Sequence, residues 1–186
     1  MPSKVEIANK ALIRLGVDTI SSFTEDSEPA RKVNAIWNMV LEEILSEADW
    51  NFAKRWATLA RVDETPINGF TYAYQLPTNP KCIKVIRFYD DATKWVIEDG
   101  KLYTNAETAK IRYIALVDDA GKYPIWFANA LSYKLAYELA YSLTGKTSRE
   151  QQLLQEYQAA LDAAMAADAQ EGTPDVVDQN PVSILR

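Results

Sequence analysis

The sequence predicts an α+β fold in which helices from both ends of the chain pack together, with a small antiparallel β-sheet inserted between them. Apolar residues recur at helical spacing in four segments: 3–15, 27–48, 124–144 and 148–169. Between the second and third segments, from about residue 50 to 117, polar and apolar residues alternate in short stretches separated by turn sequences. We therefore expect one mainly helical domain over residues 1–170, followed by an extended C-terminal arm over 171–186.

The first helix has clear signals at both ends. Ser3 and Glu6 have the spacing of a capping box, and Gly16 follows the last apolar residue of the helical stripe. In the loop that comes next, Ile20 and Phe23 are expected to turn inward because they are the large apolar residues of a polar segment.

The second helix is expected to begin near Ser27 and to end near Ala48. Its apolar residues recur at spacings of three and four, so one side should face the core. The other side is expected to face solvent, and it carries the polar residues Arg31, Lys32, Asn34, Glu42, Glu43 and Glu47.

After Asp49 the helical period gives way to a period of two. Trp50, Phe52 and Trp56 alternate with polar or small residues, which favours a strand, although a continued helix also fits these residues. Further strands are expected in three stretches rich in β-branched and aromatic residues: 70–76, 82–89 and 111–117.

The sharpest local signal in the insertion is the Asp-Gly pair at 99–100. This pair favours a two-residue type I′ turn because both positions must adopt a positive φ. The turn would place Glu98 opposite Lys101 and Ile97 opposite Leu102 in a β-hairpin.

The third helix, between Pro124 and Gly145, is predicted to be apolar on two opposite sides. One side carries Ala128, Leu131, Leu135 and Leu139, and the other carries Trp126, Ala130, Tyr133, Tyr137 and Tyr141. Lys134 and Glu138 are expected to pair along the polar strip between them. Such a helix is either sandwiched inside one domain or gives one face to a partner. The candidate subunit-interface residues are Trp126, Tyr133, Tyr137 and Tyr141.

The last helix is expected to be capped by Ser148 and to precede a polar arm that contains several apolar residues. A purely solvated tail would have little use for them, whereas an extended peptide could bury them on another subunit. The candidate docking residues are Val176, Val177, Val182, Ile184 and Leu185. A disordered tail with chance apolar residues is the alternative.

The composition excludes several classes of chemistry. The chain has no His, and Cys82 is its only cysteine, so no intrachain disulfide, zinc site or His-assisted nucleophile is expected, and no cofactor is predicted. Cys82 is expected to be a small buried hydrophobe. Five of the six net negative charges lie after residue 146, and the rest of the chain is close to neutral. Sequence-specific DNA binding is therefore not expected, because affinity for phosphates needs clustered Lys and Arg. No apolar run is long enough to span a membrane, and no signal peptide is evident, so a cytoplasmic protein is expected.

Two groups of residues are candidate sites. Paired carboxylates could serve glycoside hydrolysis, although a solvated helix face also explains them: Glu42, Glu43, Glu47 and Asp49. Cations interleaved with aromatic residues could touch nucleic acid weakly, although the polar outer face of a sheet explains them as well: Lys81, Lys84, Arg87 and Lys94, with Phe88, Tyr89 and Trp95.

Several segments of the chain carry a known pattern: 6–16, 20–23, 28–30, 40–45, 50–53, 72–77 and 124–141. They resemble the tail tubular protein A family, the head-to-tail adaptors of short-tailed bacteriophages, and related adaptors of other tailed phages. The likeness spans about residues 3 to 165 and rests on structural motifs without a catalytic signature.

The resemblance implies a protein that is made in the host cytoplasm and resides in the virion at the head–tail junction. It implies a homo-oligomeric ring of about twelve copies that joins the portal protein to the next tail component, a nozzle or tail tube protein. DNA would pass through the channel without specific binding, and the arm could dock on the portal or a neighbouring copy. Some family members are ascribed carbohydrate- or peptidoglycan-cleaving activity, for which we assign no residues. A structural protein rather than an enzyme is thus expected; the alternatives are a phage-associated glycan hydrolase that uses a carboxylate pair and a monomeric binding module.

Overall fold

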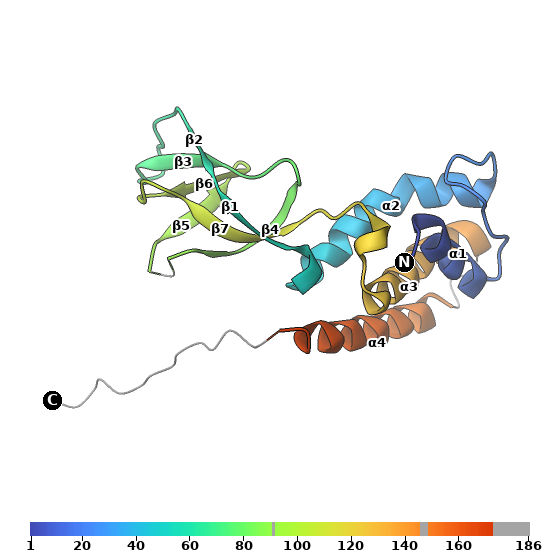
Figure 1. Ribbon diagram of the computed structural model, residues 1–186. Coiled ribbons are helices and arrows are strands. Elements are labelled where there is room, and N and C mark those ends of the chain that lie inside the picture. The colour runs from blue at the N-terminus through green and yellow to red at the C-terminus, as the bar shows by residue number, and fades with distance from the viewer. Residues whose placement is uncertain (91, 146–148, 173–186) are drawn as a thin grey trace.

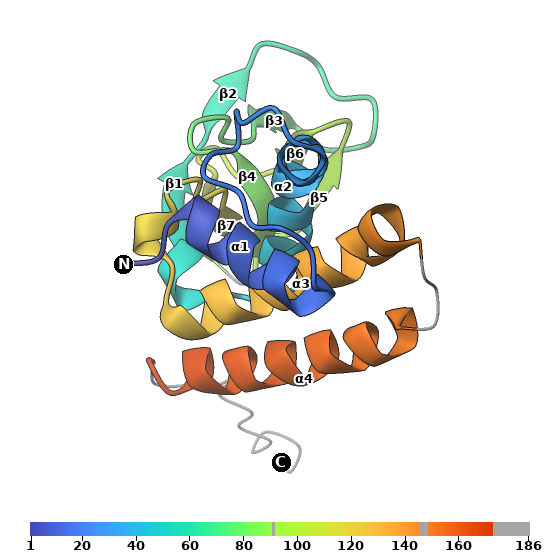
Figure 2. The same cartoon turned by 90° about the vertical axis from the view of Figure 1, so that its right-hand side faces the viewer.

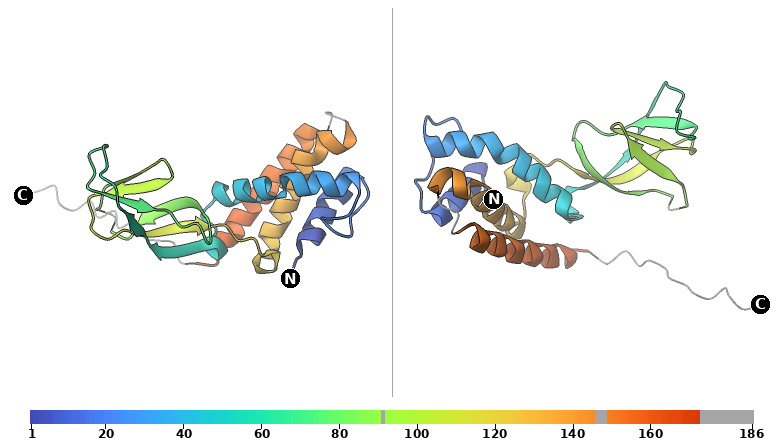
Figure 3. Two further views of the ribbon diagram at one scale, coloured as in Figure 1. Left: turned by 90° about the horizontal axis from the view of Figure 1, so that it is seen from above. Right: turned by 180° about the vertical axis from the view of Figure 1, so that it is seen from behind.

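The computed structural model describes residues 1–90, 92–145 and 149–172, which form a helical module and a β module (Figure 1). The helical module contains α1 (Lys4–Leu15), α2 (Glu28–Glu47), α3 (Ile125–Thr144) and α4 (Glu150–Ala169). The chain enters the β module after α2 and leaves it before α3, so helices from both chain ends pack together around an insertion. The predicted α+β class is confirmed. Seen from above, the helices lie at one end of the molecule and the strands at the other (Figure 3).

The helix boundaries follow the predicted local signals closely. The Ser3 hydroxyl accepts a hydrogen bond from the Glu6 N–H, and the Glu6 carboxylate accepts one from the Ser3 N–H, which completes the capping box. Gly16 ends α1 with a φ of 70°, a conformation that glycine adopts without steric cost. Ser27 caps α2, and α3 begins one residue after Pro124. The expected cap of α4, Ser148, lies outside the described residues.

The β module contains two antiparallel sheets rather than the single small sheet expected. Its strands are β1 (Lys54–Thr58), β2 (Ala60–Val62), β3 (Tyr72–Gln75), β4 (Cys82–Phe88), β5 (Trp95–Glu98), β6 (Lys101–Thr104) and β7 (Lys110–Ala115). The strand orders are β1-β7-β4 and β2-β3-β6-β5. At Leu59, between β1 and β2, the chain passes from one sheet to the other. The module thereby encloses its own apolar core, which includes Tyr74, Leu102 and Ile111.

The predicted hairpin is present with the predicted register. Asp99 and Gly100 have φ values of 48° and 69° between β5 and β6. Glu98 pairs with Lys101 and Ile97 with Leu102. Two adjacent positive φ angles are the requirement of a type I′ turn, so the prediction from the Asp-Gly pair is confirmed.

The junction between the modules differs from the prediction. Residues 51–53 form a short 3-10 helix, so the predicted strand at Trp50 and Phe52 is wrong, and β1 starts only at Lys54. Trp50 is fully buried, its indole N–H donates to the Ile44 carbonyl at 2.8 Å, and its ring stacks on Trp126. Burial of two aromatic rings against α3 therefore overrides the local alternation.

The two modules share apolar contacts across the three-stranded sheet. Ile114 of β7 belongs to the helical core, and Ile83, Ile86 and Leu116 pack against that core. On the other face of the same sheet, side chains such as Ile111 contribute to the core of the β module. The sheet β1-β7-β4 is therefore covered by helices at one end of its outer face and open at the other.

Candidate functional site

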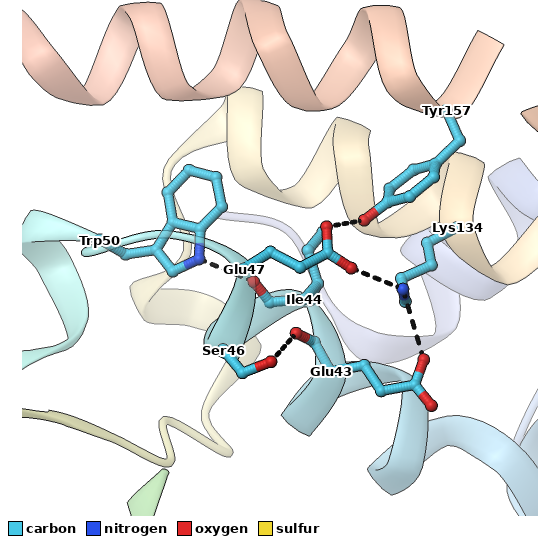
Figure 4. Close-up of polar contacts among 7 residues, drawn as sticks. All are labelled: Glu43, Ile44, Ser46, Glu47, Trp50, Lys134 and Tyr157. Carbon is cyan, nitrogen blue, oxygen red and sulfur yellow. Dashed lines mark hydrogen bonds and ion pairs between the residues drawn. The ribbon is translucent and has the colours of Figure 1, made fainter. Parts of the chain in front are cut away.

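Lys134 of α3 is buried where three helices meet, and its side chain is the centre of a polar cluster (Figure 4). Its ammonium nitrogen lies 2.7 Å from a Glu47 carboxylate oxygen and 3.3 Å from one of Glu43. The Tyr157 hydroxyl of α4 donates to the other Glu47 oxygen. The expectation that Glu43 and Glu47 belong to a purely solvent-facing side is wrong. Their spacing of four residues turns both toward α3.

The expected pairing of Lys134 with Glu138 along α3 is replaced by these contacts to α2. Burial by itself would lower the pKa of Lys134, but the carboxylates of Glu47 and Glu43 outweigh it and raise that pKa. Burial, together with the bond to Glu47, raises the pKa of Tyr157. At neutral pH the lysine is therefore protonated and the tyrosine neutral, so neither is poised as a nucleophile or base.

The carboxylates weighed for glycoside hydrolysis are all engaged by lysines. Glu42 lies 2.8 Å from Lys81, and Asp49 lies 2.7 Å from Lys84. These two pairs tie the end of α2 and the following turn to β4. Because Glu43 and Glu47 bind Lys134, the four carboxylates join structural elements rather than converge on a common cleft.

The described residues offer no other evident reactive centre. Cys82 is only partly buried in the β module, and its partial burial raises the pKa of the thiol to about 11. A thiol with such a pKa is protonated at neutral pH and is a poor nucleophile. Within ranges 1–90, 92–145 and 149–172, no group of three or more His, Cys, Asp or Glu side chains is placed to hold a metal ion.

The aromatic side of α3 is largely used within the chain. α3 packs against α1 and α2 as well as α4, and Trp126, Tyr133 and Tyr137 are partly buried against the helical core. The Arg14 guanidinium lies 3.7 Å from the centre of the Tyr133 ring. Tyr141 is the exposed member of the predicted set, with 60% of its surface accessible. A subunit contact through these residues stays a prediction. Of the four, Tyr141 is the one whose ring a second subunit could reach most easily.

A second surface, which sequence patterns did not single out as a unit, lies on the open part of the sheet β1-β7-β4. Strand register places Trp56 beside Arg112 and Arg112 beside Arg87, so these three side chains cross the sheet in one row. Both guanidinium groups lie within 6 Å of the Trp56 ring centre, at 5.6 and 5.7 Å.

The neighbouring row of the same sheet adds Tyr89 and Lys110. Tyr89 contacts Trp56 edge-to-face at 5.9 Å, and the Lys110 ammonium lies 5.5 Å from the Tyr89 ring centre. Trp56 is 51% and Tyr89 68% exposed, and together with Lys110 they line a shallow depression. We call this surface the cationic–aromatic face: Trp56, Arg87, Tyr89, Lys110 and Arg112.

From the sequence, Arg87 and Tyr89 fall in one group with Lys81, Lys84 and Lys94. Lys81 and Lys84 are instead paired with α2, and Trp56 and Arg112 join from strands distant in sequence. The predicted docking residues of the arm lie outside the described residues: Val176, Val177, Val182, Ile184 and Leu185.

Comparison with models of known protein families gives no match for this sequence, and comparison with curated proteins gives none either. In the part of the chain that the structure describes, no helix is both long enough and apolar enough to cross a membrane.

Proposed function

We propose that this protein is a structural head-to-tail adaptor of tailed bacteriophages. Copies of it would form a ring under the portal, join the capsid to the tail at the head–tail junction of the virion, and leave a channel for DNA. The sequence segments that resemble such adaptors supply the hypothesis, and its ring of about twelve copies and its tail partner come from that resemblance alone.

One structural observation supports the proposal over an enzymatic function. The groups that could perform chemistry, Lys134, Glu43, Glu47 and Tyr157, join three helices to one another. Two exposed aromatic rings, Trp56 and Tyr89, lie instead with Lys110 on a sheet face with only a shallow depression. Such a distribution suits a protein that works through contacts with other chains.

The test is assembly with the portal protein encoded in the same genome. Purified adaptor and portal rings are mixed at physiological salt and followed by sedimentation and electron microscopy. We expect a ring of this protein seated on the portal, and at most weak DNA binding that salt abolishes. A protein that stays monomeric and leaves the portal unoccupied would refute the adaptor function, and clearing in a peptidoglycan zymogram would favour the hydrolase.

A further inference from the structure

Charge is distributed very unevenly between the two parts of the chain. Residues 54–117 carry ten Lys and Arg against seven Asp and Glu, whereas the remaining residues carry ten against nineteen. The insertion therefore has a net charge of +3, and the rest of the chain has −9. Two copies of this protein would attract each other when the β module of one approaches the helical module of the other.

On the positively charged β module, one surface is suited to such a contact. The cationic–aromatic face combines Trp, Tyr and Arg, the residue types that contribute most to protein–protein contacts. The carboxylate of Asp90, the residue after Tyr89, accepts hydrogen bonds within its own turn from the Ala92 N–H and the Thr93 hydroxyl. Exposed rings of this size are seldom left in water on a protein surface without a contact to make.

The negative end has a matching surface on the outermost helix. α4 lies along the outside of the helical module, with α3 on its inner side (Figure 2). It contains four acidic residues and no Lys or Arg; of the four, Asp162 is exposed, Glu150 and Glu156 are half-buried, and Asp168 is buried. On its exposed side, Asp162 is surrounded by the small side chains of Ala159, Ala163 and Ala166. Aromatic rings could lie flat against such a side while neighbouring cations approach the carboxylate.

We propose that the cationic–aromatic face of one copy docks on the exposed side of α4 of a second copy. This inference rests on the proposed function, because it names the contact between neighbours in the ring. The two surfaces differ, so the contact is head-to-tail, and successive copies close into a ring when the rotation between them allows. A second copy is favoured over nucleic acid because the chain itself supplies a surface that fits the face, the side of α4 on which the Asp162 carboxylate is exposed among small side chains.

Single-surface variants test the contact through self-association measured by sedimentation velocity. Lys110→Glu on the face and Asp162→Arg on α4 each reverse one exposed charge. We expect each to weaken self-association at least about tenfold at low salt, and raised salt to weaken the wild-type protein in the same direction. Trp56→Ala removes the central ring and should act likewise. Circular dichroism confirms that each variant is folded.

Matched controls lie on the other sheet of the β module. Lys94→Glu reverses an exposed charge near β5, and Ile97→Ala removes an exposed apolar side chain within that strand. Both should self-associate as the wild-type protein does, because β5 lies in the sheet that does not carry the cationic–aromatic face.

Mixing the two variants gives the sharpest result. In a head-to-tail contact, Lys110→Glu protein still has an intact α4, and Asp162→Arg protein still has an intact face. Each alone should be mostly monomeric, whereas an equimolar mixture should associate again, because one pair of surfaces is intact and the other pair carries two reversed, and therefore again opposite, charges.

The outcomes separate this contact from the adaptor function. If the wild-type protein assembles and both variants assemble equally well, the contact is wrong and the adaptor function stands. If the wild-type protein neither self-associates nor attaches to portals, the adaptor function fails, and this contact with it. If the face variants lose DNA binding in a gel shift but assemble normally, the face belongs to nucleic acid and the proposed contact is overturned.

Discussion

In the helical module the ammonium group of Lys134 is buried among two carboxylates and a tyrosine, whereas in the β module that of Lys110 lies exposed beside Tyr89. The charge of Lys134 is balanced by carboxylates of its own chain, and these carboxylates raise its pKa. Lys110 contacts an aromatic ring that is itself mostly in water. The contrast between these two lysines is one of role: Lys134 joins helices to one another, whereas Lys110 is accessible on the surface of the β module.

The difference between Lys134 and Lys110 is tested most directly by removing each charge in turn. Lys134→Met keeps the length of the side chain but leaves Glu47 and Glu43 without their cation. We expect a loss of about 2 kcal/mol in the free energy of unfolding, because the two carboxylates lose their cation, while their partial exposure lets water compensate part of that loss. Urea denaturation followed by circular dichroism measures it.

Lys110→Met is the matched change in the β module. Its expected effect on the free energy of unfolding is within about 0.5 kcal/mol, as for other exposed lysines. Equal losses for the two variants would mean that the two lysines do not differ in role. At high pH the difference should shrink: the raised pKa of Lys134 means that its contribution is complete below 10.5 and is lost as the pH rises through the folded-state value.

A smaller effect is expected at the tip of the β module, where backbone conformation rather than charge decides stability. Gly100 has a φ of 69°, so Gly100→Ala should cost about 1 kcal/mol through strain at that turn. Asp99→Asn is the control, because Asn tolerates positive φ at least as well as Asp. Thermal unfolding monitored by circular dichroism compares them, and an Ala variant as stable as the control would show that the turn relaxes.

The features that could be predicted from the sequence are those decided within a few residues. The Ser3–Glu6 capping box, the end of α1 at Gly16 and the hairpin at Asp99 each depend on neighbours in the chain. Their hydrogen bonds and φ preferences are fixed by local geometry, so a pattern of residue types suffices to find them.

The features that could not be predicted depend on partners distant in sequence. Glu47 resembles a solvated residue until α3 brings Lys134 against it, 87 residues later in the chain. Trp56 and Arg87 meet only through their common neighbour on β7. Periodicity identifies which residues share a face of one element, but not which element covers that face. Only Arg87 and Tyr89 of the cationic–aromatic face belong to the group of cations and aromatic residues considered from the sequence, because the strand register decides which other side chains join them.

The smallest expected effect concerns Asp168, an acidic residue of α4 that is buried in the helical module. Only 7% of its surface is exposed, and its carboxylate accepts a hydrogen bond from the Asn51 N–H at 2.8 Å. Burial raises the pKa of Asp168, and the Asn51 N–H offsets this only in part. Because the folded-state pKa lies above the unfolded one, this group favours folding most below pH 3.8, and that benefit is lost as the pH rises through the folded-state value.

Asp168→Asn removes the charge and keeps an oxygen that can accept from Asn51. At pH 7 we expect the variant to be more stable than the wild-type protein by about 0.5 kcal/mol, a rise in Tm of about 1–2 °C. At pH 3 both side chains are neutral, so the difference should vanish. Asp162→Asn makes the same substitution at an exposed position of the same helix and is the control. A variant that is less stable than the wild-type protein at pH 7 would show that the charged hydrogen bond to Asn51 outweighs the cost of burial, and the helical module would then gain cohesion from this carboxylate as well.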